Sequence, residues 1–289
     1  MDGLEKALSH LSTEKTCKTH SIVDGTPRCN WCGAEIEPMV KLMFKGREKP
    51  FGAKRCSCPE AQAYWIESDR KLEADKAARE EYDRRMVIDQ LFKQSLLPSR
   101  WRDRTFDAFE VTDENRQAYN SAKAYADNFS RETKDGLILS GKVGRGKTHL
   151  VAAVGMELLS RGHSVIFGTV TGLLSQIRNT YSGSSRETEQ MALKRLTGCQ
   201  LLIIDDLGKE KVIDPKTPSE ISWVEQTVYE IINTRYDDNK PFLITTNMNI
   251  FDLPKKYPNN GDAILSRLLE VCRGVPMDGP DWRTRGMRK

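Results

Sequence analysis

Residues 141–148 read G-K-V-G-R-G-K-T, directly after the apolar run 137–139 and directly before the helix-like run 149–159. Glycines at this spacing let backbone N–H groups close around a di- or triphosphate, and the start of the following helix adds partial positive charge. Lys147 is expected to reach the β- and γ-phosphates, and Thr148 to hold Mg²⁺. The glycines expected to border the nucleotide are Gly141, Gly144 and Gly146. The stretch predicts a strand, a phosphate-binding loop and a helix, with an ordinary glycine turn as the plain alternative.

Short apolar runs alternate with helix-like segments from about residue 99 onward. The expected strands are 137–140, 164–170, 201–205, 241–246 and 273–277. Short apolar strands that alternate with helices indicate a parallel sheet covered by helices on both faces. The fold class predicted from the sequence is therefore α/β.

Polar side chains follow two of these strands. The run 201–206 reads L-L-I-I-D-D, so Asp205 and Asp206 stand at the carboxyl end of an apolar strand. Asp205 is expected to hold Mg²⁺ and Asp206 to orient or deprotonate an attacking water. Asn247, after the next strand, could position that water. The plain alternatives are an acidic turn and a turn asparagine.

A lone arginine, Arg267, lies in the otherwise apolar stretch 264–269. Such an arginine could complete the site of a neighbouring subunit and stabilise charge on the γ-phosphoryl group. That role implies self-association. A solvated arginine on the helix surface is the alternative.

Cysteines cluster near the amino terminus, where five of the seven lie within the first 58 residues. Close pairs of cysteines in an intracellular protein favour metal over disulfides, and tetrahedral zinc needs four ligands. Six residues are candidates: Cys17, His20, Cys29, Cys32, Cys56 and Cys58. Free reduced thiols are the alternative.

The composition sets the broad class of the chain. Its 289 residues are 30% charged and 38% hydrophobic, with a net charge of +4. No apolar run reaches the roughly 18 residues that a membrane span needs, and the first residues lack the features of a signal peptide. We therefore expect a cytoplasmic protein with no membrane contact, and the mildly basic charge permits nucleic-acid binding.

At the quoted motifs the chain resembles the AAA+ ATPases, and within them the helicase loaders of the DnaC/DnaI type and the related IstB transposition ATPases. The similarity covers about residues 98–285 and rests on four stretches: 141–150, 201–208, 244–247 and 264–268. It implies Lys147 and Thr148 in Walker A, Asp205 and Asp206 in Walker B, Asn247 as sensor 1 and Arg267 as arginine finger. Arg283 resembles the arginine of the family's terminal Gly-x-Ser-aromatic-Arg element, although Asp281 replaces the serine.

The resemblance also implies how the chain uses ATP and DNA. Many AAA+ enzymes carry glutamate where this chain has Asp206, and the shorter side chain predicts slow hydrolysis that a partner stimulates. Loaders place a helix that touches single-stranded DNA after the second strand, where this chain has residues 172–181. Arg178 could pair with a phosphate and Tyr181 could stack on a base, or both could belong to a packing helix.

The preferred zinc ligands follow from the resemblance as well. C-x-x-C followed by C-x-C is similar to the zinc module of DnaI-type loaders, which favours Cys29, Cys32, Cys56 and Cys58. Cys17 and His20 with the first pair remain the alternative set. The implied organisation is a zinc-binding, helicase-interacting module (1–58), a charged helical linker (59–97) and an AAA+ ATPase domain (98–289).

The function implied by the resemblance is an ATP-dependent loader that delivers a hexameric replicative DNA helicase onto single-stranded DNA. Two alternatives stay open. One is a transposition helper ATPase of the IstB kind, which usually lacks a cysteine module. The other is a zinc-containing, nucleic-acid-binding regulator switched by ATP, since six basic residues lie between positions 41 and 55.

Overall fold

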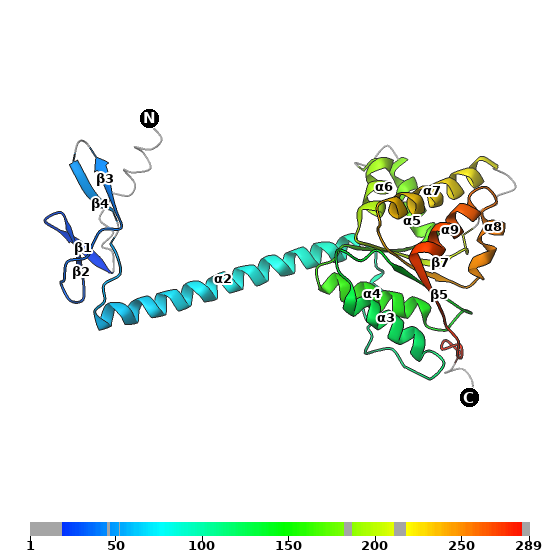
Figure 1. Cartoon of the computed structure of the whole chain (residues 1–289), viewed down its shortest axis with the longest axis horizontal. Coiled ribbons are helices and arrows are strands. Elements are labelled where there is room, and N and C mark those ends of the chain that lie inside the picture. The colour runs from blue at the N-terminus through cyan, green and yellow to red at the C-terminus, as the bar shows by residue number, and fades with distance from the viewer. Residues whose placement is uncertain (1–18, 45–46, 52, 182–186, 211–217, 285–289) are drawn as a thin grey trace. The chain divides into compact units, whose positions relative to one another are not determined.

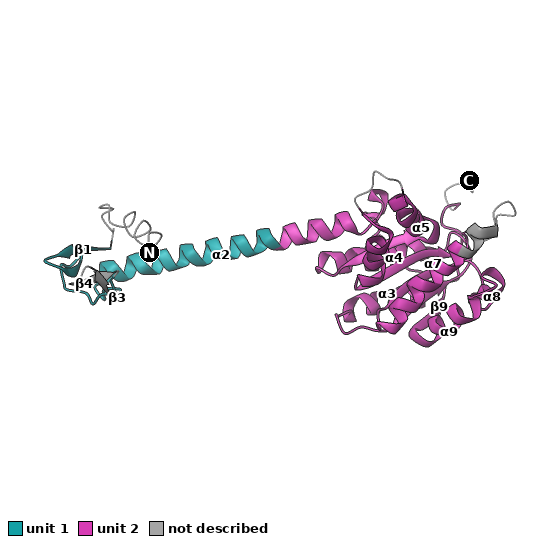
Figure 2. Cartoon of the chain, turned by 90° about the horizontal axis from the view of Figure 1, so that it is seen from above, with its two compact units in different colours: residues 1–83 teal, residues 84–289 magenta. Residues whose placement is uncertain are grey.

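The computed structural model describes residues 19–44, 47–51, 53–181, 187–210 and 218–284 (Figure 1). The chain divides into two compact units, residues 1–83 and residues 84–289 (Figure 2). The boundary lies inside one long helix, α2 (Pro59–Gln94), in the segment where a charged helix is expected. None of the helices in the described ranges combines the length and the apolar character needed to cross a lipid bilayer.

Unit 1 contains two antiparallel hairpins and the first part of the long helix. Its strands are β1 (His20–Val23), β2 (Thr26–Cys29), β3 (Val40–Phe44) and β4 (Arg47–Phe51). The sequence analysis did not predict these strands. The buried apolar cluster in the described part of this unit is small, comprising Cys29, Ile36 and Ala61. A core of this size stabilises a fold weakly, so a further crosslink such as a metal is expected.

Unit 2 is built on a five-stranded sheet in which every pairing is parallel, in the order β6-β7-β8-β5-β9. The strands are β5 (Gly136–Ser140), β6 (Val165–Thr169), β7 (Leu201–Leu207), β8 (Phe242–Thr246) and β9 (Cys272–Pro276). The helices are α3 (Arg116–Asn128), α4 (Lys147–Ser160), α5 (Val170–Arg178), α6 (Glu189–Gly198), α7 (Pro218–Asp237), α8 (Leu253–Lys256) and α9 (Gly261–Val271). The predicted α/β class and parallel sheet are confirmed.

The two faces of the sheet carry separate cores. In β7, Leu201 and Ile203 join the cluster beneath α3 and α4, whereas Leu202 and Ile204 join the cluster beneath α5, α6 and α7 (Figure 1). Neighbouring residues of a strand point to opposite faces, so a strand covered on both sides is apolar throughout. This explains the uninterrupted apolar runs in the sequence.

One buried arginine ties two connections of this unit together, the one from α6 to β7 and the one from α7 to β8. Arg235, on α7, is fully buried. Its guanidinium donates to the carbonyls of Leu196, Cys199 and Pro241 at 3.1, 2.9 and 2.6 Å. It therefore satisfies carbonyls at the end of α6 and just before β7 and β8.

Candidate nucleotide site

The glycine-rich loop joins β5 to α4 at the carboxyl edge of the sheet, as predicted. Gly146 caps α4 in the left-handed region, with a φ of 92°. A Cβ on Gly144 would lie 1.9 Å from Oδ1 of Asp281, so a larger residue does not fit there. The loop needs glycine both for its backbone turn and for the close approach of a neighbouring segment.

Lys147 lies buried beneath this loop. Its Nζ donates to the carbonyls of Gly141 and Lys142 at 2.7 and 2.9 Å and to Oδ1 of Asn247 at 2.7 Å. Burial lowers the pKa of Lys147, and the nearby carboxylate of Asp206 opposes that shift. These three acceptors use all three N–H groups of the ammonium, so a phosphate oxygen that approaches the loop would replace at least one of them.

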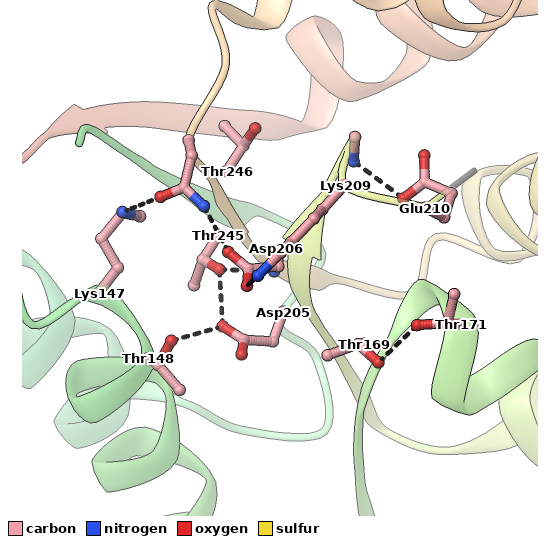
Figure 3. A network of polar contacts seen from close by, with 12 residues as sticks. Lys147, Thr148, Thr169, Thr171, Asp205, Asp206, Lys209, Glu210, Thr245 and Thr246 are labelled. Carbon is pink, nitrogen blue, oxygen red and sulfur yellow. Dashed lines mark hydrogen bonds and ion pairs between the residues drawn. The ribbon is translucent and has the colours of Figure 1, made fainter. Parts of the chain in front are cut away.

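Asp205 is a buried carboxylate between two hydroxyls. Thr148 Oγ1 donates to its Oδ1 at 2.9 Å, and Thr245 Oγ1 donates to the same oxygen at 2.7 Å (Figure 3). Burial raises the pKa of Asp205, although both hydrogen bonds favour the ionised form. A threonine hydroxyl and a carboxylate are oxygen ligands of the kind Mg²⁺ accepts, so Thr148 and Asp205 fit the predicted magnesium site.

The local backbone explains how Asp206 comes to face the same site. Successive side chains of a strand point to opposite faces, but β7 shifts register against β8 between Ile204 and Leu207. Asp206 lies within this irregularity with a φ of 58°. Bulges of this kind re-aim a side chain, and aspartate tolerates the left-handed region better than most residues.

Asn247 connects the lysine to this second aspartate. Its Oδ1 accepts from Lys147, and its Nδ2 donates to Asp206 Oδ1 at 2.6 Å. Thr245 supports the same corner, because its hydroxyl accepts from the backbone N–H of Asp206 at 2.9 Å. Thr245 was not predicted as a site residue, although two adjacent threonines at the end of an apolar strand, Thr245 and Thr246, were the available signal.

Arg283 reaches the site through a turn of the carboxyl-terminal segment. The backbone N–H of Trp282 donates to the carbonyl of Gly144 at 3.0 Å, which fixes this turn to the loop. Asp281 Oδ1 accepts from the N–H of Arg283 at 2.9 Å, so the aspartate that replaces serine closes the turn.

Several of these side chains line a cavity of about 440 Å³. It is lined by Lys147, Thr148, Asp206, Asn247 and Arg283, among others. Its volume lies within the range of small-molecule sites. Asp205 lines a second cavity, to which Thr148 and Asp206 also contribute. The structure thus brings together every predicted nucleotide-site residue except Arg267.

Arg267 lies elsewhere, on α9. Its guanidinium carbon is 5.4 Å from the ring centroid of Tyr229 and 5.5 Å from that of Tyr236. One guanidinium nitrogen donates to the carbonyl of Ala263 at 3.1 Å. Arg267 does not line the nucleotide cavity of its own chain, so any contact with a γ-phosphate would have to reach a second subunit.

The predicted DNA contacts share one aromatic neighbour. Arg178 and Tyr181 are exposed at the end of α5. The guanidinium of Arg178 lies 4.6 Å from the ring centroid of Trp223, and the ring of Tyr181 lies 6.5 Å from it. The hydroxyl of Tyr181 donates to Glu189 at 2.5 Å. Trp223 was not predicted, because it lies on α7, far away in the sequence.

Unit 1 holds the cysteine cluster. The sulfurs of Cys29, Cys32, Cys56 and Cys58 all lie within 4.8 Å of one another. The Sγ atoms of Cys29 and Cys58 are 3.8 Å apart, and those of Cys32 and Cys56 are 3.6 Å apart. A zinc–sulfur bond of about 2.3 Å in a tetrahedron places sulfurs about 3.8 Å apart, so the four cysteines fit zinc.

Of the two residues specific to the alternative ligand set, the structure describes His20 but not Cys17. His20 lies outside the cluster of four sulfurs, and its Nδ1 is 3.1 Å from the hydroxyl of Thr19. Cys17 lies outside the described residues. The geometry therefore favours the four-cysteine set.

Comparisons with known proteins agree with this geometry. The family described as "IstB-like ATP binding protein" matches residues 61–289. The replicative helicase loader DnaC of Escherichia coli K12 is 29% identical over 193 residues, which are 66% of this chain and 74% of that protein. DnaC of Buchnera aphidicola subsp. Acyrthosiphon pisum is 31% identical over 147 residues, 50% of this chain and 58% of that protein.

Solved structures share the fold. A crystal structure of the DnaC helicase loader superposes with a TM-score of 0.53 at 22% identity, over 63% of this chain and all of that one. A structure of DnaI gives 0.50 at 20% identity, over 65% of this chain and 95% of that one. Unit 2 therefore has the AAA+ fold, and the chain belongs to the IstB-like ATP-binding protein family.

Proposed function

We propose that this protein is an ATP-dependent loader that delivers a replicative DNA helicase onto single-stranded DNA. The observation that carries the proposal is the 29% identity to the DnaC loader over 74% of that protein. The nucleotide site supports it, because Lys147, Asp206 and Asn247 form one hydrogen-bonded chain at the loop.

The site residues divide the work on ATP between them. Lys147 and Arg283 attract the phosphates, while Thr148 and Asp205 would hold Mg²⁺, which neutralises phosphate charge when bound. Asp206 accepts a proton from the attacking water or orients it, and Asn247 holds that carboxylate in place. The short side chain of Asp206 holds a water less well for in-line attack, so we expect slow turnover that a partner stimulates.

The other predicted roles belong to the same proposal. The zinc-bearing module of residues 1–58 docks on the helicase, the helix of residues 59–97 links it to the ATPase domain of residues 98–289, and Arg178 and Tyr181 contact DNA. Arg267 acts on the nucleotide of a second subunit, which requires self-association. A loader of this kind works in the cytoplasm.

Co-purification with candidate replicative helicases tests the loader role. We expect the full chain to retain a hexameric helicase in ATP and to release it when ATP is replaced by ADP. Lys147→Ala is the matched control, because it removes the phosphate-binding cation. Retention of no helicase in either nucleotide, by a protein that does bind ATP, would contradict the loader role.

A transposition helper is the second candidate, favoured by the family match to IstB-like proteins. Stimulation of a transposase in a strand-transfer assay, without helicase binding, would support it. A third outcome is possible for DNA: equal affinity for single strands in ATP and ADP would favour a nucleic-acid-binding regulator.

A further inference from the structure

A second cavity of about 590 Å³ adjoins the nucleotide cavity. Four residues line both cavities: Arg104, Thr148, Asp206 and Arg283. Thr148 and Asp206 belong to the predicted magnesium and water-activating groups. The junction of the two cavities is therefore the region where a terminal phosphate would lie, and Arg104 borders it. Nothing in the family motifs assigns a role to Arg104.

Arg104 is held in place by an aromatic stack. Trp101 is 8% exposed and packs edge-on against Phe167 of β6, with ring centroids 4.7 Å apart. The guanidinium carbon of Arg104 lies 5.1 Å from the Trp101 ring centroid. The backbone N–H of Arg104 also donates to the Trp101 carbonyl at 3.0 Å. A cation over a buried indole keeps its orientation better than a solvated arginine does.

A second contact ties the same segment to the phosphate-binding helix. The residue after Arg104 is Thr105, whose carbonyl lies 2.8 Å from Nε2 of His149. Because a carbonyl only accepts, the imidazole donates this hydrogen bond. His149 directly follows Thr148 in the first turn of α4. Arg104 is thus anchored to the sheet on one side and to the phosphate-binding helix on the other.

Among the residues that the structure describes, no carboxylate forms an ion pair with the guanidinium of Arg104, although Asp205 lies near enough to act on its charge. Burial lowers the pKa of Arg104, the nearby cations Arg100 and Arg283 lower it further, and Asp205 opposes them. The second cavity is lined by three arginines, Arg100, Arg104 and Arg283, and by two acids, Asp205 and Asp206, and this excess of positive charge favours an anion.

We propose that Arg104 binds the terminal phosphate of ATP within its own subunit and so distinguishes ATP from ADP. The inference rests on the proposed nucleotide-binding function, but not on the identity of the partner. An arginine fork matches phosphate oxygens, and the group that ADP lacks is the one nearest to Thr148 and Asp206. Arg104 would therefore act in cis, whereas Arg267 would act across a subunit interface.

Equilibrium binding to the full chain tests the assignment, with Mg²⁺ and either ADP or a non-hydrolysable ATP analogue. We expect Arg104→Ala to weaken binding of the ATP analogue about tenfold or more and to leave ADP binding nearly unchanged. Arg104→Lys should recover part of the loss, since it restores charge without the fork. Arg102→Ala is the matched control, because Arg102 is exposed in the same segment and lines neither cavity.

Two outcomes would overturn the assignment. Equal losses for ADP and the ATP analogue in both Arg104 variants would indicate general attraction or a folding defect, which thermal unfolding of each variant would reveal. Unchanged affinities for both nucleotides would show that Arg104 does not contact the terminal phosphate. Helicase binding does not enter this measurement, so failure of the loader role and failure of the Arg104 role are distinguished.

Discussion

At the scale of single residues, the site depends on a carboxylate held where water is largely excluded. Asp205 is 3% exposed, and its hydrogen-bond donors are Thr148 and Thr245. Burial raises its pKa, so the folded chain binds a proton there more tightly than the unfolded chain does. Above the raised pKa the ionised group destabilises the fold, and this penalty shrinks as the pH falls below that pKa until it is gone at the lower pKa of the unfolded chain. The proposed magnesium-binding role would account for a carboxylate at this buried position despite its cost in stability.

Asp205→Asn should therefore raise the melting temperature of the nucleotide-free protein at pH 7. Asparagine keeps the acceptor oxygen for both hydroxyls and removes the buried charge. For a domain of this size, each kcal/mol corresponds to roughly 2–4 °C. The gain should shrink as the pH is lowered from the raised pKa toward the pKa of the unfolded chain, and the variant should lose the Mg²⁺-dependent part of ATP binding.

Thermal unfolding over a pH series measures this effect. Asp103→Asn is the control, because that carboxylate is exposed and its removal should change little. A lower melting temperature at pH 7, or a gain that does not depend on pH, would show that the charge of Asp205 is not a burden on the fold.

At the scale of elements, the sequence predicted the strands, because most strands of the sheet are short apolar runs. All five sheet strands lie within three residues of their expected bounds at either end. Helix α3 was missed, although Ala118, Ala122 and Ala126 repeat every four residues and are all buried. Alanine side chains are small, so a helix face built from them has low hydrophobicity in the sequence even when it packs closely against its neighbours.

The residues of the candidate site also fall into those that the sequence predicted and those that it did not. Lys147, Asp205 and Asn247 stand in short contiguous motifs, and the sequence identified them. Arg104 and Trp223 take up their positions only through packing between segments that are distant in the chain. No local sequence pattern therefore predicts them. The four strands of unit 1 were also missed, because their pairing depends on hairpin turns and on the cysteine cluster rather than on apolar periodicity.

The cysteine cluster leads to a prediction about unit 1. Cys58→Ser should lower the zinc content below one ion per chain and unfold this unit, because its described apolar core is small. Unit 2 should keep its melting temperature and its nucleotide affinity. Metal analysis with amide hydrogen exchange on the full chain measures both effects.

His20→Ala is the matched control, since His20 lies beside the cluster in sequence but outside the four sulfurs. It should leave the metal content unchanged. Loss of zinc from His20→Ala or from Cys17→Ser would instead select the alternative ligand set.

At the scale of the whole molecule, the question is how many chains make one active site. Arg267 rests between two tyrosines and away from the nucleotide cavity of its own chain. An arginine that acts across an interface is worth orders of magnitude in turnover. The groups proposed to bind phosphate, Lys147 and Arg283, line this cavity and Arg267 does not, so the proposed role of Arg267 predicts that hydrolysis depends on assembly.

Mixing two inactive variants tests this dependence. Lys147→Ala and Arg267→Ala should each lose nearly all ATPase activity. A mixture of the two should recover activity, because an interface can pair the intact Lys147 of one subunit with the intact Arg267 of the next. Steady-state phosphate release, measured with DNA and helicase present, reports the recovery. No gain over the sum of the two variants alone would argue against an arginine in trans.

The buried arginine of α7 should make one part of the fold insensitive to pH and to salt. A guanidinium keeps its proton throughout the physiological pH range, and dissolved ions scarcely screen a charge that solvent does not reach. We therefore expect the hydrogen bonds of Arg235 to the end of α6 and to the residues before β7 and β8 to persist at low pH, at neutral pH and at high salt concentration. Conditions that change the protonation of Asp205 and Asp206, at the carboxyl end of β7, would therefore leave the amino-terminal end of that strand held in place.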